Sequence, residues 1–184
     1  MNPATFLRPL RLRLWSLGLL LMVALPAQAE APLPNAVEAG DERLPLIRQD
    51  TIRYAGLFRV YSLGVYAPEP QPLPRLLATD AGTCIEARYH RDLEHEILIE
   101  AAYRILEQQH PESQLQAHRD GLAHIHAAYV DIRAGDRYRL CRLRDAGLTL
   151  DHNGRRVLSQ PDPGLARLYL GIWLGPGGIL GGDG

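Results

Sequence analysis

The order of strand-like and helix-like segments constrains the fold of this chain more than any other feature of its sequence. Alternating or continuous apolar runs predict seven strands, at 44–47, 51–54, 57–66, 84–90, 138–143, 148–151 and 155–158. Helical periodicity predicts a short helix at 74–78 and three longer ones, at about 92–109, 111–129 and 164–174. Strands and helices that are segregated in this way are typical of an α+β domain with an antiparallel sheet backed by helices. A parallel nucleotide-binding sheet, in which the two alternate, is disfavoured.

Local signals support several of these boundaries. Asn153-Gly154 is the strongest hairpin signal in the chain, because a tight two-residue turn requires positive φ angles. Asp92 is expected to cap the first long helix, which His110-Pro111 ends. Asp162, followed by a proline, is expected to cap the last helix.

The first 29 residues have the three parts of a secretory signal peptide: a basic start, an apolar run of 12 residues and an Ala27-Gln28-Ala29 cleavage site. The apolar run is too short to span a bilayer. We therefore expect cleavage after Ala29, a periplasmic protein and no membrane span after cleavage. We divide the chain into a signal peptide (1–29), a flexible N-terminal segment (30–43), one domain (44–178) and a flexible tail (179–184).

Cleavage changes the charge and the redox setting. The formal net charge falls from −1 to −4, because residues 1–29 hold three arginines and no acidic residue. A near-neutral chain gives no electrostatic reason to expect nucleic acid as a partner. Cys84 and Cys141 could be buried free thiols or, in an oxidising compartment, a disulfide. The spacing of the two cysteines does not decide between free thiols and a disulfide. The sequence does not define the oligomeric state.

Motifs for nucleophilic catalysis and phosphate binding are missing from the sequence. There is no Gly-x-Ser-x-Gly, and the glycine-rich stretch at 175–178 follows a helix instead of leading into one. Among the histidines, His124 and His126 would point in different directions on a helix, and His118 alone lies on an apolar stripe. We expect neither a metal ion nor a cofactor.

Arg53 is the candidate site residue with the clearest chemical rationale. It precedes a mostly apolar strand that carries Tyr61 and Tyr66, and a guanidinium beside an apolar cavity can bind a carboxylate or stabilise a phenolate or enolate. A surface arginine in an ion pair is the alternative that residue type alone favours.

The segment 51–66, TIRYAGLFRVYSLGVY, resembles the arginine-to-VY-x-x-x-Y motif of the bacterial chalcone isomerase-like family. Further pieces fit this family in order, from about residue 36 to 178: Arg91-Asp92, Gly135-Asp136, Asn153-Gly154 and Ile172-Trp173-Leu174-Gly175. The resemblance implies an open-faced β-sandwich, in which a large antiparallel sheet packs under a layer of helices with a ligand cleft between them.

The resemblance also implies roles for individual residues. Arg53 matches the arginine that stabilises a phenolate in the plant isomerases and holds a carboxylate in fatty-acid-binding relatives. Tyr61 stands where the plant motif has a threonine, and this difference favours binding over catalysis. Tyr103 is a candidate for lining the cleft, with a role in the core as the alternative.

Three hypotheses follow for the function. The first is an exported protein that binds a small amphipathic or aromatic ligand, such as a fatty acid or polyphenol, in an apolar cleft with Arg53 as the anchor. The second is an intramolecular lyase or isomerase that acts on a chalcone-like enone, with Arg53 and Tyr61 as catalytic residues. The third is a non-catalytic interaction protein of the cell envelope that uses the sheet surface.

Overall fold

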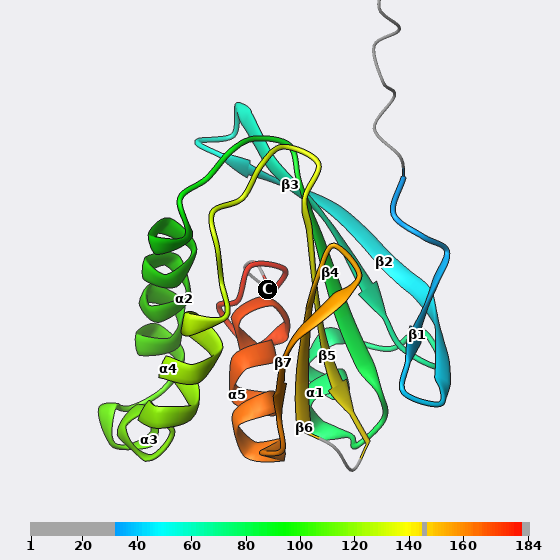
Figure 1. Ribbon diagram of the computed structural model, residues 1–184. Coiled ribbons are helices and arrows are strands. Elements are labelled where there is room, and N and C mark those ends of the chain that lie inside the picture. Colours follow the sequence, from blue (N-terminus) through cyan, green and yellow to red (C-terminus); the bar gives the residue numbers. More distant parts are fainter. Residues whose placement is uncertain (1–31, 145–146, 182–184) are drawn as a thin grey trace, which may run out of the picture.

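The computed structural model describes residues 32–144 and 147–181, which form one antiparallel sheet with helices on one of its faces (Figure 1). The strands lie in the sheet in sequence order: β1 (Ala36–Ala39), β2 (Glu42–Tyr54), β3 (Phe58–Tyr66), β4 (Thr83–Tyr89), β5 (Arg137–Leu143), β6 (Gly147–His152) and β7 (Arg155–Gln160). The helices are α1 (Leu73–Ala78), α2 (His95–Gln109), α3 (Glu112–Ala117), α4 (Arg119–Ala127) and α5 (Pro163–Leu174). The predicted fold class is therefore confirmed.

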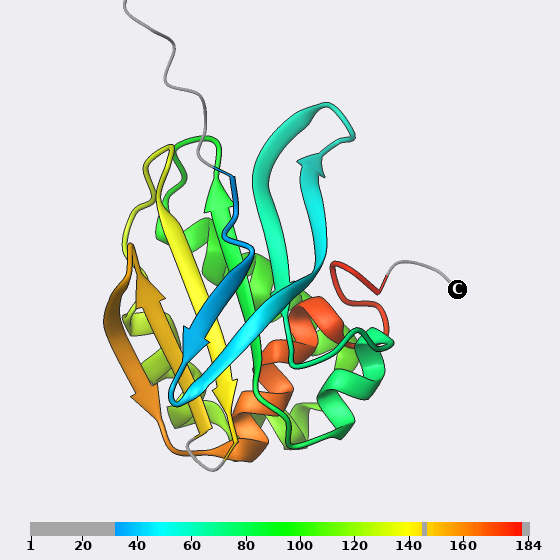
Figure 2. The ribbon, with the colours of Figure 1, turned by 90° about the vertical axis from the view of Figure 1, so that its right-hand side faces the viewer.

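The layers follow from where apolar side chains alternate along the strands. The face of the sheet that carries Leu63, Ile85 and Leu140 packs against α5, which is the most apolar helix and is buried along most of its length. In Figures 1 and 2, α5 lies between the sheet and the α2–α4 layer, so α5 forms the centre of the core.

The opposite face of the sheet has a smaller core of its own. Here β1 and the first part of β2 cross over the sheet, as Figure 2 shows from that side. They cover Tyr66, Cys84 and Cys141 with buried side chains such as Val37 and Leu44. Residues 30–43, which we expected to be flexible, thus include strand β1, because its alternate side chains find an apolar surface to cover.

Two predicted strands form one. The segments 44–47 and 51–54 both belong to β2, which pairs first with β1 and then with β3. Irregular register at Leu46/Arg48 and at Ile52/Arg53 lets the strand bend between these partners. The Asn153-Gly154 turn forms as predicted, with φ angles of 51° and 82°.

Of the two predicted N-terminal helix caps, one is confirmed and one is wrong. Asp162 caps α5 as predicted, since its Oδ1 accepts a hydrogen bond from Leu165 N at 3.0 Å. Asp92 does not cap α2; its carboxylate accepts from Ala134 N at 2.8 Å instead. The first backbone N–H of α2, on His95, donates to Asp131 Oδ1 at 3.2 Å, so the capping carboxylate comes from a distant loop.

The helical segment predicted at 111–129 is divided. α3 ends at Ala117 and α4 begins at Arg119, with His118 at φ −107° and ψ 10° between them. The break turns Leu122, Ile125 and His126 of α4 toward the core, whereas α3 has no buried residue.

A disulfide joins Cys84 on β4 to Cys141 on β5, two residues directly opposite each other in the sheet. Part of the expected flexible tail is also ordered, since Ile179 N and Leu180 N donate to carbonyls of Ile172 and Trp173. The expected signal peptide lies outside the described residues. Within 32–144 and 147–181, no helix has the length and apolar character needed to cross a membrane.

Candidate functional site

A small cavity of about 80 Å³ lies where α2 and α5 face the sheet. We call it the tyrosine cavity, because four tyrosines and a tryptophan supply its polar atoms: Tyr61, Tyr89, Tyr129, Tyr169 and Trp173. The other lining residues are aliphatic: Leu98, Ala101, Ala102, Ile105, Ile172 and Ile179. Two alanines on α2 leave room that longer side chains would fill.

The aromatic side chains form a continuous cluster across the helix–sheet boundary. Tyr61 and Tyr89, which are paired on β3 and β4, have ring centroids 5.4 Å apart. Tyr129 packs edge-on against Tyr138 at 4.9 Å, and the Tyr169 hydroxyl donates to the Tyr129 hydroxyl at 3.3 Å. Phenol groups are therefore concentrated in otherwise apolar surroundings.

Burial determines the protonation state of these phenols. It raises the pKa of Tyr61 to about 12, with a smaller opposing effect from the Trp173 indole, and it raises the pKa of Tyr89 and Tyr129 well above the ordinary value. At neutral pH these hydroxyls can donate hydrogen bonds but do not act as bases. The Trp173 Nε1 is buried and interacts with Tyr61, but it makes no well-formed hydrogen bond with a described residue. The cavity thus has donors available for an acceptor atom.

A second, open depression of about 400 Å³ lies at the end of β2, β3 and β4 where the β2–β3 hairpin projects. We call it the arginine hollow, after three of its six lining residues: Arg53, Arg59 and Arg91, with Leu57, Phe58 and His90. No residue that lines it is acidic. Arg53 makes no hydrogen bond or ion pair with another described residue. The hollow therefore presents positive charge to solvent.

The arginine hollow and the tyrosine cavity are neighbours along the strands. Tyr61 follows Arg59 by two residues on β3, and Tyr89 precedes Arg91 by two residues at the end of β4. Two residues of a strand span about 7 Å. One small amphipathic molecule could thus place its anionic group in the hollow and its apolar tail in the cavity.

The three predicted site residues lie in different places. Arg53 is exposed in the arginine hollow, and Tyr61 is buried in the tyrosine cavity. Tyr103 lies outside both, because α2 turns Leu98, Ala101, Ala102 and Ile105 toward the cavity. Its ring instead packs edge-on against His126 at 4.6 Å and lines a groove between α2 and the α3–α4 segment.

Tyr89, Tyr129, Tyr169 and Trp173 line the cavity but were not among the predicted site residues. Tyr89 lies in the alternating pattern of its strand, and Tyr129 and Tyr169 lie on apolar helical stripes. The pattern correctly indicates that such residues face inward. It does not distinguish a residue that lines a cavity from one that fills the core.

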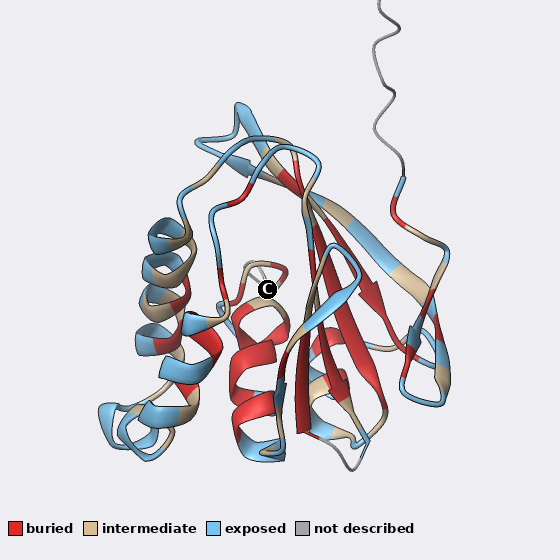
Figure 3. Cartoon of the chain, viewed as in Figure 1, coloured by how far each residue is buried: buried red, intermediate tan, exposed pale blue. Residues whose placement is uncertain are grey.

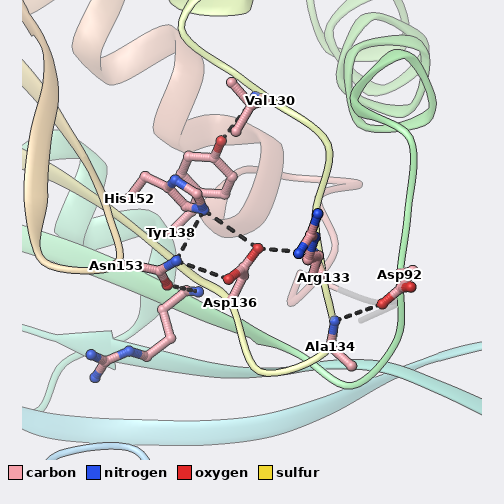
Figure 4. Close-up of polar contacts among 9 residues, drawn as sticks. Asp92, Val130, Arg133, Ala134, Asp136, Tyr138, His152 and Asn153 are labelled. Atoms are coloured by element: carbon pink, nitrogen blue, oxygen red, sulfur yellow. Dashed lines mark hydrogen bonds and ion pairs between the residues drawn. The ribbon is translucent and has the colours of Figure 1, made fainter.

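A polar network fixes the loops at this same end of the sheet (Figure 4). The Asp136 carboxylate accepts hydrogen bonds from Arg133 N and Asn153 Nδ2, each at 2.8 Å, and lies 3.6 Å from His152 Nε2. Partial burial alone would raise the pKa of Asp136, but these donors lower it. The network holds the 130–136 loop beside the β6–β7 turn, and Tyr138 stacks on His152 within it.

The histidines of α4 lie on different sides of the helix. His126 is buried between Tyr103 and Tyr169, and burial lowers its pKa to about 4, whereas His124 is exposed and bonds to Gln160. Elsewhere His95, Glu96 and Asp131 approach one another within 4.8 Å. This exposed group caps α2, and its hydrogen bonds account for it without a metal ion.

Another groove, of about 620 Å³, lies between α1, the C-terminal end of α2 and α5. Arg167 lines it, but this guanidinium is occupied by hydrogen bonds to Leu77 O at 2.8 Å and Asp80 Oδ1 at 3.3 Å. The guanidinium in this groove is therefore occupied, unlike that of Arg53 in the arginine hollow.

Comparison with known proteins agrees with the fold described above. The model of a family described as chalcone isomerase-like matches residues 26–179. Among solved structures, a fatty-acid binding protein of Arabidopsis thaliana is similar, with a TM-score of 0.62 and 16% sequence identity over 80% of this chain and 86% of that chain. No curated protein matches the chain significantly.

Proposed function

The chain belongs to the chalcone isomerase-like family, and from this premise we propose that it binds a small amphipathic acid between its sheet and its helices. The acid group would bind Arg53 in the arginine hollow, and the apolar part would enter the tyrosine cavity. The observation that carries this proposal is the spacing of the two sites along β3: Arg59 of the arginine hollow and Tyr61 of the tyrosine cavity are two residues apart, and Arg53 is the strand partner of Arg59.

The similar Arabidopsis structure is that of a fatty-acid binding protein, which supports a fatty acid as the ligand. A carboxylate suits Arg53, because a guanidinium offers paired donors that match its two oxygens. An aliphatic chain suits the alanines and isoleucines of the cavity. Protonated phenols would also accommodate the oxygen atoms of a polyphenol.

The tyrosine cavity is too small to hold an acyl chain as it stands. At about 80 Å³ it has room for two or three waters at most, at about 30 Å³ each. An acyl chain must therefore widen the space between α2 and the sheet. The exposed Ala101 and Ile97 show that α2 is only partly covered, which makes it the element that can move.

The test uses the fluorescence of Trp173, which is the only tryptophan after Trp15. In a Trp15→Phe chain, titration with palmitate should change the Trp173 emission. Arg53→Ala should weaken binding by about 1.5–3 kcal/mol, the range for a hydrogen bond to a charged group. Arg43→Ala, which removes an exposed arginine elsewhere on β2, should leave affinity unchanged.

The methyl ester of palmitate separates the charge from the chain. It should bind the wild-type protein and the Arg53→Ala variant equally, because it has no carboxylate for Arg53 to hold. Equal affinity of both proteins for the acid would rule out Arg53 as the anchor. Binding with no change in Trp173 emission would rule out the cavity.

A second candidate function is ring closure of a chalcone-like enone, which the protonated state of Tyr61 favours. The substrate phenol would lose its proton to water, and its oxygen would add to the β-carbon of the enone while Arg53 stabilises the negative charge. The Tyr61 hydroxyl would then protonate the enolate carbon and regain a proton from water, so that no net proton is gained or lost. Loss of chalcone absorbance faster than the uncatalysed reaction, and dependent on Arg53, would support it. No acceleration would exclude this substrate class.

The proposal includes export to the periplasm. The disulfide between Cys84 and Cys141 supports it, because such bonds persist mainly in oxidising compartments. Purified periplasmic protein should begin at Glu30, which mass spectrometry can establish. A chain that keeps residues 1–29 and stays in the cytoplasm would contradict this part.

A further inference from the structure

The tip of the β2–β3 hairpin, residues 54–58, exposes an unusual amount of apolar surface. Tyr54 is 71% exposed, Leu57 74% and Phe58 56%. Only two other large apolar residues in the described ranges are as open, Ile97 and Val130 at 50% each. Single exposed apolar residues are common on proteins, but three within five positions form a patch that needs an explanation.

The backbone holds this patch outward. Ala55 and Gly56 both have positive φ angles, 49° and 70°, and Leu57 N donates to Tyr54 O at 3.1 Å. This is the tight hairpin turn that matches the twist of the strands. Ala55 adopts a conformation that is unfavourable for a residue with a Cβ. In Figures 2 and 3 the hairpin rises beyond the rest of the sheet with its tip exposed, so its side chains are the first to meet an approaching surface.

Positive charge surrounds the apolar patch. Arg53 and Arg59 flank it on the two strands, and the Arg91 guanidinium lies 5.8 Å from the centre of the Phe58 ring. Asp50, further back on β2, pairs with Arg48 at 2.6 Å, and no acidic residue lines the arginine hollow. The hairpin tip therefore combines exposed aromatic and aliphatic groups with a cluster of arginines, of which Arg53 and Arg91 line the same hollow as Phe58.

We propose that the hairpin tip docks on the surface of a bilayer that contains anionic phospholipids. Tyrosine and phenylalanine side chains are favoured at the boundary between headgroups and acyl chains, and arginines beside them can reach lipid phosphates. A soluble anion would account for the arginines but not for Tyr54 and Leu57. An apolar protein partner would account for the patch but not for the arginine cluster.

Membrane docking goes beyond ligand binding and does not depend on it. It would nevertheless have a consequence for it, because the arginine hollow includes Leu57 and Phe58 of the tip. A tip inserted among lipids would place the hollow at the level of the headgroups. An amphipathic acid could then pass from the bilayer toward the tyrosine cavity without crossing bulk water.

The test is flotation of the full chain with vesicles of phosphatidylcholine alone and with vesicles of phosphatidylcholine and phosphatidylglycerol in equal parts. We expect binding to the mixed vesicles only, and weaker binding at high salt because exposed charges are screened. Arg91→Gln should lower the partition coefficient about fivefold, which corresponds to about 1 kcal/mol per basic residue at an anionic surface.

The double variant Tyr54→Ser/Leu57→Ser should lower binding at least about tenfold, since each serine removes apolar area that the membrane would bury. Val130→Ser is the control, because it removes an apolar residue that is 50% exposed and lies outside the hairpin. In the single variant Tyr54→Ser, which should also weaken vesicle binding, palmitate titration followed by Trp173 should be unchanged, because Tyr54 does not line the arginine hollow. That result separates docking from the proposed ligand binding.

Three outcomes would overturn the proposal. The wild-type chain could bind neither vesicle, the double variant could bind mixed vesicles as well as the wild type does, or Val130→Ser could lose as much binding as the double variant. Cross-linking of the tip to a protein in place of lipid would assign this surface to a protein partner.

Discussion

The two ends of the sheet both carry arginines, but they use them in opposite ways. At the end near α1, the Arg142 guanidinium is buried and donates to the carbonyls of Leu76, Leu77 and Ala81 at 2.7, 3.2 and 3.0 Å. At the end with the β2–β3 hairpin, Arg53 has no such partner among the described residues and faces solvent. We call the end near α1 the closed end, because Arg142 is bonded to carbonyls there. We call the end with the hairpin the open end, because Arg53 faces solvent there.

The difference shows that a guanidinium is available for a ligand only when it lacks hydrogen-bond partners within the protein. Arg142 donates to the Leu76 and Leu77 carbonyls in the last turn of α1, where carbonyls lack partners within the helix, and Leu77 O also accepts from Arg167. The function of Arg142 is structural, although it lies on the core-facing side of the sheet. The carbonyl partners, and not burial or charge alone, distinguish a structural arginine from one that can bind an anion.

The largest expected effect comes from the disulfide, which belongs to the closed end. Replacing both cysteines, Cys84→Ala/Cys141→Ala, should lower the free energy of unfolding by about 4 kcal/mol in the chain-entropy model, because the bond closes a long loop. The cysteines are 57 residues apart in sequence. Urea denaturation measures the change. Unchanged stability would show that the closed end does not depend on this bond.

The second prediction sets the two arginines against each other. Arg142→Met should cost about 2–3 kcal/mol of unfolding free energy, because it removes three hydrogen bonds from a buried guanidinium, including the one to Leu76 O. Arg53→Met should change stability by less than about 0.5 kcal/mol, as expected of an exposed side chain. Denaturation of both variants under the same conditions tests this. A larger loss for Arg53→Met would reverse the assignment of structural and available ends.

The smallest expected effect concerns the polar network at the open end. Asp136→Asn should lower stability at neutral pH by about 1 kcal/mol, because the carboxylate accepts two hydrogen bonds. The pKa of Asp136 is lowered in the folded state, so its contribution is present above the ordinary aspartate value and is lost as pH falls through the lowered one.

Thermal denaturation at neutral pH and below about pH 3 tests the sign, because acid should make wild type and variant converge. Arg142→Met should show its loss at both pH values, since its partners are carbonyls that do not titrate. A difference between Asp136→Asn and wild type that grows in acid would contradict the assignment.

The sequence predicted the parts of the fold that local chemistry decides. Alternation located β3 to β7 to within a few residues, although it missed β1 and divided β2 into two strands. The Asn153-Gly154 turn and the Asp162 cap both depend on neighbours within four positions. The cap of α2 shows the limit. Asp92 has the right residue type and place, but Asp131 reaches the helix from 36 residues further along the chain. No local pattern contains that contact.

The candidate site was predictable in part for a similar reason. The sequence pointed to Arg53 and Tyr61, but it could not show that one is exposed in the arginine hollow and the other buried in the tyrosine cavity. In the sheet Tyr61 is paired with Ile52, and Arg53 is paired with Arg59 beyond a shift in register. Tyr103 was predicted to line the cleft because the sequence predicts helix α2. Which side of α2 faces the cleft depends on how the helix packs against α5.

The order of the strands has a consequence for how the chain folds. Five of the six strand pairs join segments that are close in sequence, four of them through short turns, and such contacts form quickly. The pairing of β4 with β5 is different, because α2, α3 and α4 all lie between them. The two halves of the sheet must therefore meet along this seam after a costly loop closure. Cys84 and Cys141 lie opposite each other in that seam, so oxidation secures the one strand contact that the chain is slowest to find.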